Sequence, residues 1–139
     1  MDGAVETKLA GEVGTLTHRV DISSKLTKEN YELEREKLFR PAWHPIANAT
    51  DLPKAGSYIV RELAVFNTSL LIIRGKDDVI RAFHNVCIPR GNKMIRDGMG
   101  CQRNFRCGFH GWTYSTEGGL IGVTDEASVL EIDKSTMGL

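Results

Sequence analysis

The chain has 139 residues, of which 41% are hydrophobic, and its 18 Lys and Arg residues balance its 18 Asp and Glu residues. This length and hydrophobic content predict one domain around a single core, and the absence of net charge argues against binding to nucleic acid or to an anionic membrane. The first residues show no signal-peptide pattern, and no stretch approaches a membrane span, so we expect a cytoplasmic protein. The three cysteines, an odd number, argue against a disulfide framework.

Residues 1–26 are polar and lack a sustained period, so they are expected to form an N-terminal arm ahead of a single domain over residues 27–139. A helix should open that domain, because Thr27 is a good N-cap, basic residues near the helix end suit its dipole, and Pro41 stops it. The helix has a narrow apolar stripe, which is expected to pack against the rest of the domain. The stripe comprises Tyr31, Leu38 and Phe39.

Beyond the helix the chain changes to short segments rich in β-branched and aromatic residues, which are separated by turn residues. The expected strands are 43–47, 58–63, 69–73, 79–86, 104–107, 112–115 and 120–123. The turns between them include 53–56, 75–78 and 117–119. Short strands joined by tight turns predict a mainly β fold, an antiparallel β sandwich or small barrel with one N-terminal helix.

Two segments at the ends of these expected strands contain residue types that commonly bind metal ions. The first is Cys87-Ile88-Pro89-Arg90-Gly91, and the second is Cys107-Gly108-Phe109-His110-Gly111-Trp112. A Rieske 2Fe-2S centre binds one iron through two cysteine thiolates and the other through two imidazoles, so each of two loops must supply one Cys and one His. The second segment supplies both, whereas the first has Pro89 where its histidine should stand. A proline side chain has no lone pair with which to bind iron.

Residues from about 31 to 139 resemble the N-terminal Rieske domain of the large subunit of aromatic-ring-hydroxylating oxygenases. The segments that carry the resemblance are 32–39, 82–87, 90–92 and 107–114. The resemblance implies a Rieske-like fold with the two loops adjacent at one end, and it implies Cys87, Cys107 and His110 as metal ligands. The departure at Pro89 argues against a standard cluster.

In that family the large subunit continues beyond a Gly-Leu pair like the one at 138–139, into a catalytic domain whose mononuclear iron is held by two histidines and a carboxylate. This sequence ends at the pair, and neither His18 nor His44 has a partner imidazole and carboxylate at ligand spacing. We therefore expect no catalytic residue in this chain, which is then at most one component of an oxygenase system, an oxidoreductase.

Three states of the metal site stay open. An empty site would leave two loops stabilised without metal, with Pro89 and the Phe109 ring filling part of the space of the cluster. A 2Fe-2S cluster would use the three implied ligands and take Cys101, water or a partner residue as the fourth. Zinc is satisfied by three thiolates and one imidazole, but the hairpin that carries Cys101 would then have to fold back.

Two functions follow from these states. The first is a degenerate Rieske domain that acts as a non-catalytic accessory or structural partner. It would bind a full-length Rieske oxygenase large subunit, or further copies of itself in a trimer-like ring, through the loops around Arg90, Asn92 and Trp112. The second is an electron-transfer component that carries a 2Fe-2S cluster with an altered ligand set. We favour the first, because a rigid proline suits a loop that is stable without metal.

Overall fold

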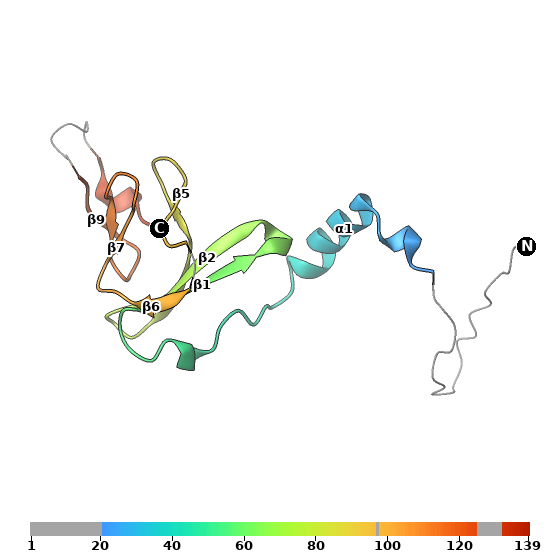
Figure 1. Ribbon diagram of the computed structural model, residues 1–139, viewed down its shortest axis with the longest axis horizontal. Helices are drawn as coiled ribbons and strands as arrows, with labels where there is room; N and C mark the ends of the chain where they lie inside the picture. The colour runs from blue at the N-terminus through green and yellow to red at the C-terminus, as the bar shows by residue number, and fades with distance from the viewer. Residues whose placement is uncertain (1–20, 97, 125–131) are drawn as a thin grey trace, which may run out of the picture.

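The computed structural model describes residues 21–96, 98–124 and 132–139. Its strands are β1 (Ser57–Leu63), β2 (Thr68–Arg74), β3 (Ile80–His84), β4 (Val86–Cys87), β5 (Asn92–Lys93), β6 (Met99–Cys101), β7 (Phe105–Arg106), β8 (Thr113–Tyr114) and β9 (Leu120–Gly122). One α-helix, α1 (Lys28–Glu34), precedes them and continues into a π-helical turn, η2 (Arg35–Phe39). The short 3-10 turns are η1 (Ser23–Lys25), η3 (Ala49–Asp51), η4 (Ala64–Phe66) and η6 (Lys134–Thr136). The predicted mainly β fold with a single N-terminal helix is confirmed (Figure 1).

The strands form three antiparallel sheets, with the orders β3-β2-β1-β6, β4-β5 and β7-β8-β9. Side chains alternate across the first sheet, so Val60 and Leu71 enter the main core while Ile59 and Ile72 join a smaller cluster around Leu52. The main core also takes side chains from the other two sheets and their loops: Cys87, Met94, Phe105, Cys107, Trp112, Tyr114 and Leu120. Both predicted ligand cysteines are therefore part of the packing that joins the three sheets.

The helix begins where the sequence predicts, because the Thr27 hydroxyl accepts the backbone N–H of Asn30 at 3.1 Å. The expected packing of its apolar stripe is wrong: no residue of α1 or η2 is buried, and Tyr31 and Leu38 are 45% and 61% exposed. Figure 1 shows the helix projecting away from the sheets, and its last turn, η2, contacts η4. No helix among the described residues is long and apolar enough to cross a membrane.

The strand expected at 43–47 does not form, and the segment is irregular. Trp43 is 99% exposed. Arg61 of β1 donates from Nε to the carbonyl oxygen of Ile46 at 2.9 Å, so a side chain satisfies an acceptor that a neighbouring strand would otherwise satisfy. The prediction also missed β5 and β6, which are short and carry few β-branched residues.

The turn between β8 and β9 offers a matched pair of glycines as a test of the fold. Gly118 has a φ of +90°, and a Cβ there would collide with the Phe83 ring. We expect Gly118→Ala to lower the free energy of unfolding by about 2 kcal/mol or more, because an L-residue in the left-handed region costs about 1–2 kcal/mol even before the ring has to move.

Gly119→Ala is the control, because its added Cβ would meet only Ser115 Oγ at 3.7 Å, an ordinary contact. Urea unfolding of both variants measures the difference. Equal stabilities for the two variants would contradict the turn geometry described here.

Candidate metal centre

The two predicted loops are built in the same way. Cys87 ends β4 and Cys107 follows β7, and each cysteine carbonyl accepts the backbone N–H of the glycine four residues later. The two N···O distances are 2.9 Å for Gly91 to Cys87 and 3.0 Å for Gly111 to Cys107. Both glycines have positive φ, +65° and +75°, a region that other L-residues enter only at a cost. A glycine that closes the turn therefore fixes the direction of each cysteine.

Both thiols are buried, since Cys87 and Cys107 are 3% and 2% exposed. The Sγ of Cys87 lies 3.3 Å from the hydroxyl oxygen of Tyr114, within hydrogen-bond distance. The Sγ of Cys107 accepts the side-chain amide of Asn92 at 3.4 Å and the backbone N–H of Phe109 at 3.5 Å. Each sulfur therefore has at least one polar partner that belongs to this chain.

These partners shift the acidities of the two thiols in opposite directions. Burial raises the pKa of the Cys87 thiol, and the hydrogen bond with Tyr114 offsets only part of that effect. Burial also opposes ionisation of Cys107, but the Phe109 N–H and further donors outweigh it and hold the pKa of Cys107 below its ordinary value. Each thiol also affects the other: Cys107 helps to raise the pKa of Cys87, and Cys87 helps to lower the pKa of Cys107. Burial is the main cause that raises the pKa of the Tyr114 hydroxyl, so this group stays protonated.

His110 lies at the exposed tip of the second loop rather than among the buried thiols. Its ring and that of Phe109 have centroids 4.1 Å apart, and the Arg90 guanidinium from the first loop lies 5.8 Å from the Phe109 centroid. This contact between a cation and an aromatic ring joins the two loops at their tips. Pro89 is exposed in the turn of the first loop.

The donor chemistry fits a Rieske cluster at three positions and fails at the fourth. Cys87 and Cys107 would supply the two thiolates, and His110 would supply one imidazole. Pro89 supplies no ligand atom. Within the described ranges, no group of three or more His, Cys, Asp and Glu side chains is gathered as a metal site. The ligand role of the three predicted residues stays a prediction.

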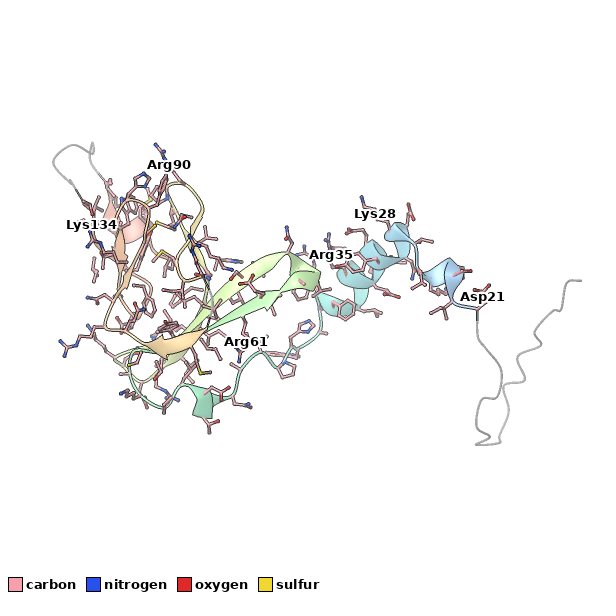
Figure 2. All side chains as sticks on the ribbon, viewed as in Figure 1. Asp21, Lys28, Arg35, Arg61, Arg90 and Lys134 are labelled. Atoms are coloured by element: carbon pink, nitrogen blue, oxygen red, sulfur yellow. The ribbon has the colours of Figure 1, made fainter. Side chains whose placement is uncertain are left out.

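Cys101, considered as a replacement ligand or as a third zinc thiolate, lies elsewhere. It is exposed on β6, pairs with Ser57 of β1, and its Sγ donates to the carbonyl oxygen of Ala55 at 3.7 Å. Figure 1 shows β6 at the lower end of the core, whereas Figure 2 shows Arg90 of the first loop at the upper end.

Asn85, to which the sequence analysis assigned no role, helps to position the first loop. Asn85 is fully buried between β3 and β4, where its side-chain amide donates to Ile95 O at 2.6 Å and to Ser69 Oγ at 3.1 Å. Its Oδ1 accepts the N–H of Ile95 at 3.0 Å. The available signal was a polar Asn within the expected strand 79–86, two residues before Cys87, because an amide that becomes buried is almost always hydrogen-bonded.

The Asn85 side chain provides a test of this arrangement. Asn85→Ala leaves both backbone groups of Ile95 without a partner, so we expect a loss of about 2–4 kcal/mol in the free energy of unfolding. Chemical denaturation monitored by tryptophan fluorescence measures it. The control is Asn104→Ala, because Asn104 is exposed and should change stability by less than about 0.5 kcal/mol. A loss for Asn85→Ala no larger than for this control would show that the amide does not hold the loop.

Known proteins are similar to this chain in sequence and in fold. A family model described as the Rieske [2Fe-2S] domain matches residues 42–133, more than half of the chain. The carnitine monooxygenase oxygenase subunit of Acinetobacter baumannii is 34% identical over 110 residues, 78% of this chain. The biphenyl 2,3-dioxygenase subunit alpha of Rhodococcus jostii is 31% identical over 121 residues, 87% of this chain. The chain belongs to the Rieske [2Fe-2S] domain family.

Solved structures of ring-hydroxylating and related oxygenases have the same fold. Naphthalene 1,2-dioxygenase with indole bound superposes with a TM-score of 0.75 at 26% identity, over 84% of this chain. A quaternary ammonium Rieske monooxygenase in complex with L-carnitine gives 0.71 at 32% identity, over 79% of this chain. The chain spans less than a third of these proteins, 29% and 26% of the two curated relatives and 26% and 31% of the two structures, and it corresponds to their Rieske portion.

Proposed function

We propose that this protein is a degenerate Rieske domain that acts as a non-catalytic accessory or structural partner of a Rieske oxygenase large subunit. The observation that carries the proposal is Pro89, which stands in the first loop where a standard cluster needs its second imidazole. With one iron left short of a ligand, this chain alone does not complete the cluster through which the family transfers electrons.

The contacts around the thiols support a loop pair that is stable without metal. Hydrogen bonds with Tyr114, with Asn92 and with the Phe109 backbone involve the two sulfurs. The glycine turns and the Arg90 contact fix the loops from outside. None of these interactions requires a bound ion, so the surface that the loops present persists when the site is empty.

The surface at the loop tips has the character of a docking site. Phe109 and Ile88 are 56% and 43% exposed there, and Arg90 and His110 add a cation and an imidazole. Beside them lies a hollow of about 520 Å³, lined by Arg96 and Phe109 among others. Exposed aromatic and Arg side chains at the rim of a hollow are typical of protein interfaces. The partner that we propose for this surface is an oxygenase large subunit. The relatives are named as subunits, and the description of one solved relative includes inter-subunit electron transfer.

A variant that restores the missing ligand tests the metal part of the proposal. We expect the parent protein, purified without oxygen, to hold well under one 2Fe-2S cluster per chain, and Pro89→His to approach one, because the restored imidazole completes the ligand set. Iron and acid-labile sulfide assays together with EPR spectra of the reduced protein measure this. Pro89→Ala is the control, since it removes the proline without adding a ligand and should resemble the parent.

A full cluster in the parent would overturn the proposal. A folded Pro89→His variant that binds no iron would show instead that His110 or the thiols have lost their ligand geometry. Adding Cys107→Ser to Pro89→His should abolish iron binding if the site is the one described here.

The docking surface yields a second test. We expect Phe109→Ala to weaken binding to a full-length large subunit by about tenfold or more, because truncation of a central aromatic side chain commonly costs over 1.4 kcal/mol. Surface plasmon resonance with the carnitine monooxygenase oxygenase subunit of Acinetobacter baumannii as the probe measures this. Ile121→Ala on β9, where Ile121 is 51% exposed, is the matched control and should bind like the parent.

No detectable association in either the parent or Pro89→His would contradict the accessory role. Self-association seen by sedimentation, lost in Phe109→Ala, would reassign the same surface to a ring of identical chains.

The second candidate function is an electron-transfer component with an altered ligand set. The observation that favours it is the pair of buried thiols with hydrogen-bond partners, because hydrogen bonds to cysteine sulfur tune the potential of iron-sulfur clusters. Two irons and two sulfides in the parent would support it. Cys101→Ser should then leave the visible spectrum unchanged, because Cys101 lies on β6, and loss of colour in that variant would show that the β6 hairpin rearranges.

A further inference from the structure

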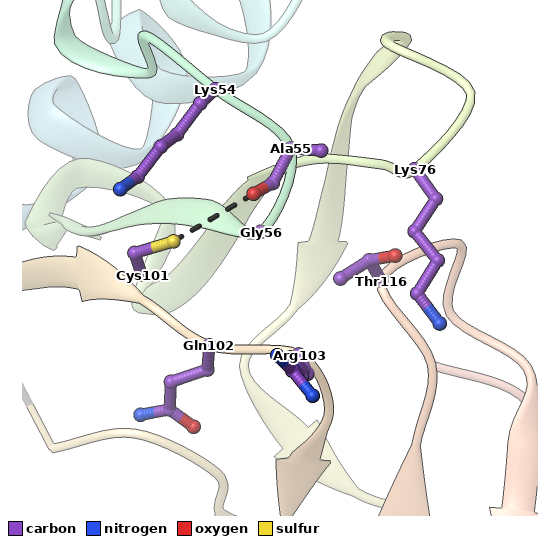
Figure 3. Close-up of a pocket in the computed structure, with 8 residues that line it drawn as sticks. All are labelled: Lys54, Ala55, Gly56, Lys76, Cys101, Gln102, Arg103 and Thr116. Atoms are coloured by element: carbon purple, nitrogen blue, oxygen red, sulfur yellow. Dashed lines mark hydrogen bonds between the residues drawn. The ribbon is translucent and has the colours of Figure 1, made fainter.

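A cavity of about 380 Å³ lies at the end of the domain that carries β6, apart from the predicted metal ligands (Figure 3). Four segments border it: the loop before β1 with Lys54, the turn between β2 and β3 with Lys76, the segment after β6 with Arg103, and the turn between β8 and β9 with Thr116. A cavity of this size suits a small molecule. No carboxylate side chain lines it.

The acidic residues nearest to this cavity are already engaged with other groups. Asp77 binds Arg81 through two hydrogen bonds of 2.9 and 2.6 Å, and Asp78 pairs with Arg74 at 3.0 Å. These ion pairs neutralise the acidic side chains of the β2–β3 turn that also carries Lys76. These two aspartates therefore do not neutralise the basic side chains that line the cavity.

Glu117 is the third neighbouring acid, and it is turned to local donors. Its Oε1 accepts the backbone N–H of Lys76 at 2.8 Å and the hydroxyl of Thr116 at 2.5 Å. Among the described residues, the side chains of Lys54, Lys76 and Arg103 form no ion pair. Three positive charges therefore border one concave site, where their fields add.

The backbone on one side of the cavity is tightly held. Gln102 donates its N–H to the carbonyl oxygen of Gly56 at 2.9 Å, and Gly56 donates its own N–H to Arg74 O at 2.8 Å. Gly56 has a φ of +85°, and a Cβ there would lie 2.5 Å from the Gln102 carbonyl oxygen. This close approach fixes the loop of Lys54 against the segment of Arg103, so the site is largely formed before any ligand arrives.

We propose that this cavity binds a compact anion with at least two negative charges, a polycarboxylate or a polyphosphate. The Arg103 guanidinium provides a planar fork for two anionic oxygens, and the Lys54 and Lys76 ammonium groups add point charges from two other sides. Three cations in one small hollow match a small multivalent anion better than a nucleic acid, which needs an extended basic surface, and the chain as a whole has no net charge.

Calorimetric titration at low ionic strength tests the site, with citrate as the polycarboxylate probe and pyrophosphate as the polyphosphate probe. We expect at least one probe to bind, and Arg103→Gln to weaken it by about tenfold, because a charge-assisted fork is lost. Lys28→Gln on α1 removes the same charge outside the cavity and should change affinity by less than about twofold.

Binding of citrate alone or of pyrophosphate alone identifies the class of anion that the cavity takes. No binding of either probe, or an equal loss for Lys28→Gln, would overturn the proposal.

The exposed thiol of Cys101, which borders the same cavity, gives an independent measurement. In each reaction the thiolate displaces one thiol from a disulfide reagent and keeps the other as a mixed disulfide. We expect the dianionic reagent 5,5′-dithiobis(2-nitrobenzoate) to lose rate in Arg103→Gln and in the presence of the bound probe. The neutral reagent 4,4′-dithiodipyridine should react at the same rate in the parent and in Arg103→Gln. Equal sensitivity of both reagents would mean that the substitution changes access to the thiol rather than anion binding, and would contradict the site.

Discussion

A hydrogen bond from a glycine N–H to the carbonyl of a cysteine, repeated in two loops, is the constraint on which the candidate site depends. In each loop the glycine adopts a positive φ and turns the chain back on itself, which aims the cysteine into the core. The buried cysteines then fill space between the three sheets. The Cys87 sulfur is hydrogen-bonded with Tyr114, and the Cys107 sulfur is hydrogen-bonded with Asn92. The ligand loops are therefore part of the core of this domain and not appendages to it.

This arrangement explains how a Rieske domain can keep its shape when a ligand is missing. The residue that departs from the cluster pattern, Pro89, lies outside the core in an exposed turn, where its fixed φ is compatible with the loop. The residues that the fold needs, Cys87 and Cys107, are the ones buried in the core. Under the proposed function, the loss of one imidazole would remove redox chemistry at little cost in packing, and it would leave the exposed tips of the two loops available for contact with another protein.

Much of this structure was predictable from local sequence. Thr27 and Pro41 mark the helix because capping and the missing N–H of proline act over a few residues. The exposure of the helix stripe was not predictable, since the apolar positions of a helix do not tell whether another part of the chain covers them. The segment at 43–47 has strand-like composition, but the Arg61 side chain takes the place of a pairing strand, an interaction between residues far apart in sequence.

The candidate site was also predictable only in part. The spacing of Cys107 and His110 predicted ligands because metal chemistry requires fixed residue types in one loop. The partners of the thiols could not be assigned, because Tyr114 meets Cys87 across 27 positions of the chain and Asn92 meets Cys107 across 15. The cavity bordered by Lys54, Lys76 and Arg103 could not be predicted from the sequence either, since it forms only when four separate segments meet.

The central claim is that the two loops are held by the protein's own contacts, whether or not a metal is bound. Amide hydrogen exchange of chelator-treated protein, followed by NMR, tests it directly at the N–H groups of Gly91 and Gly111. The account predicts protection of both groups that approaches the protection of the central strands β1 and β2. Exchange of either group at the rate of an unfolded chain, with β1 and β2 still protected, would contradict it and show that the loops need a bound metal to form.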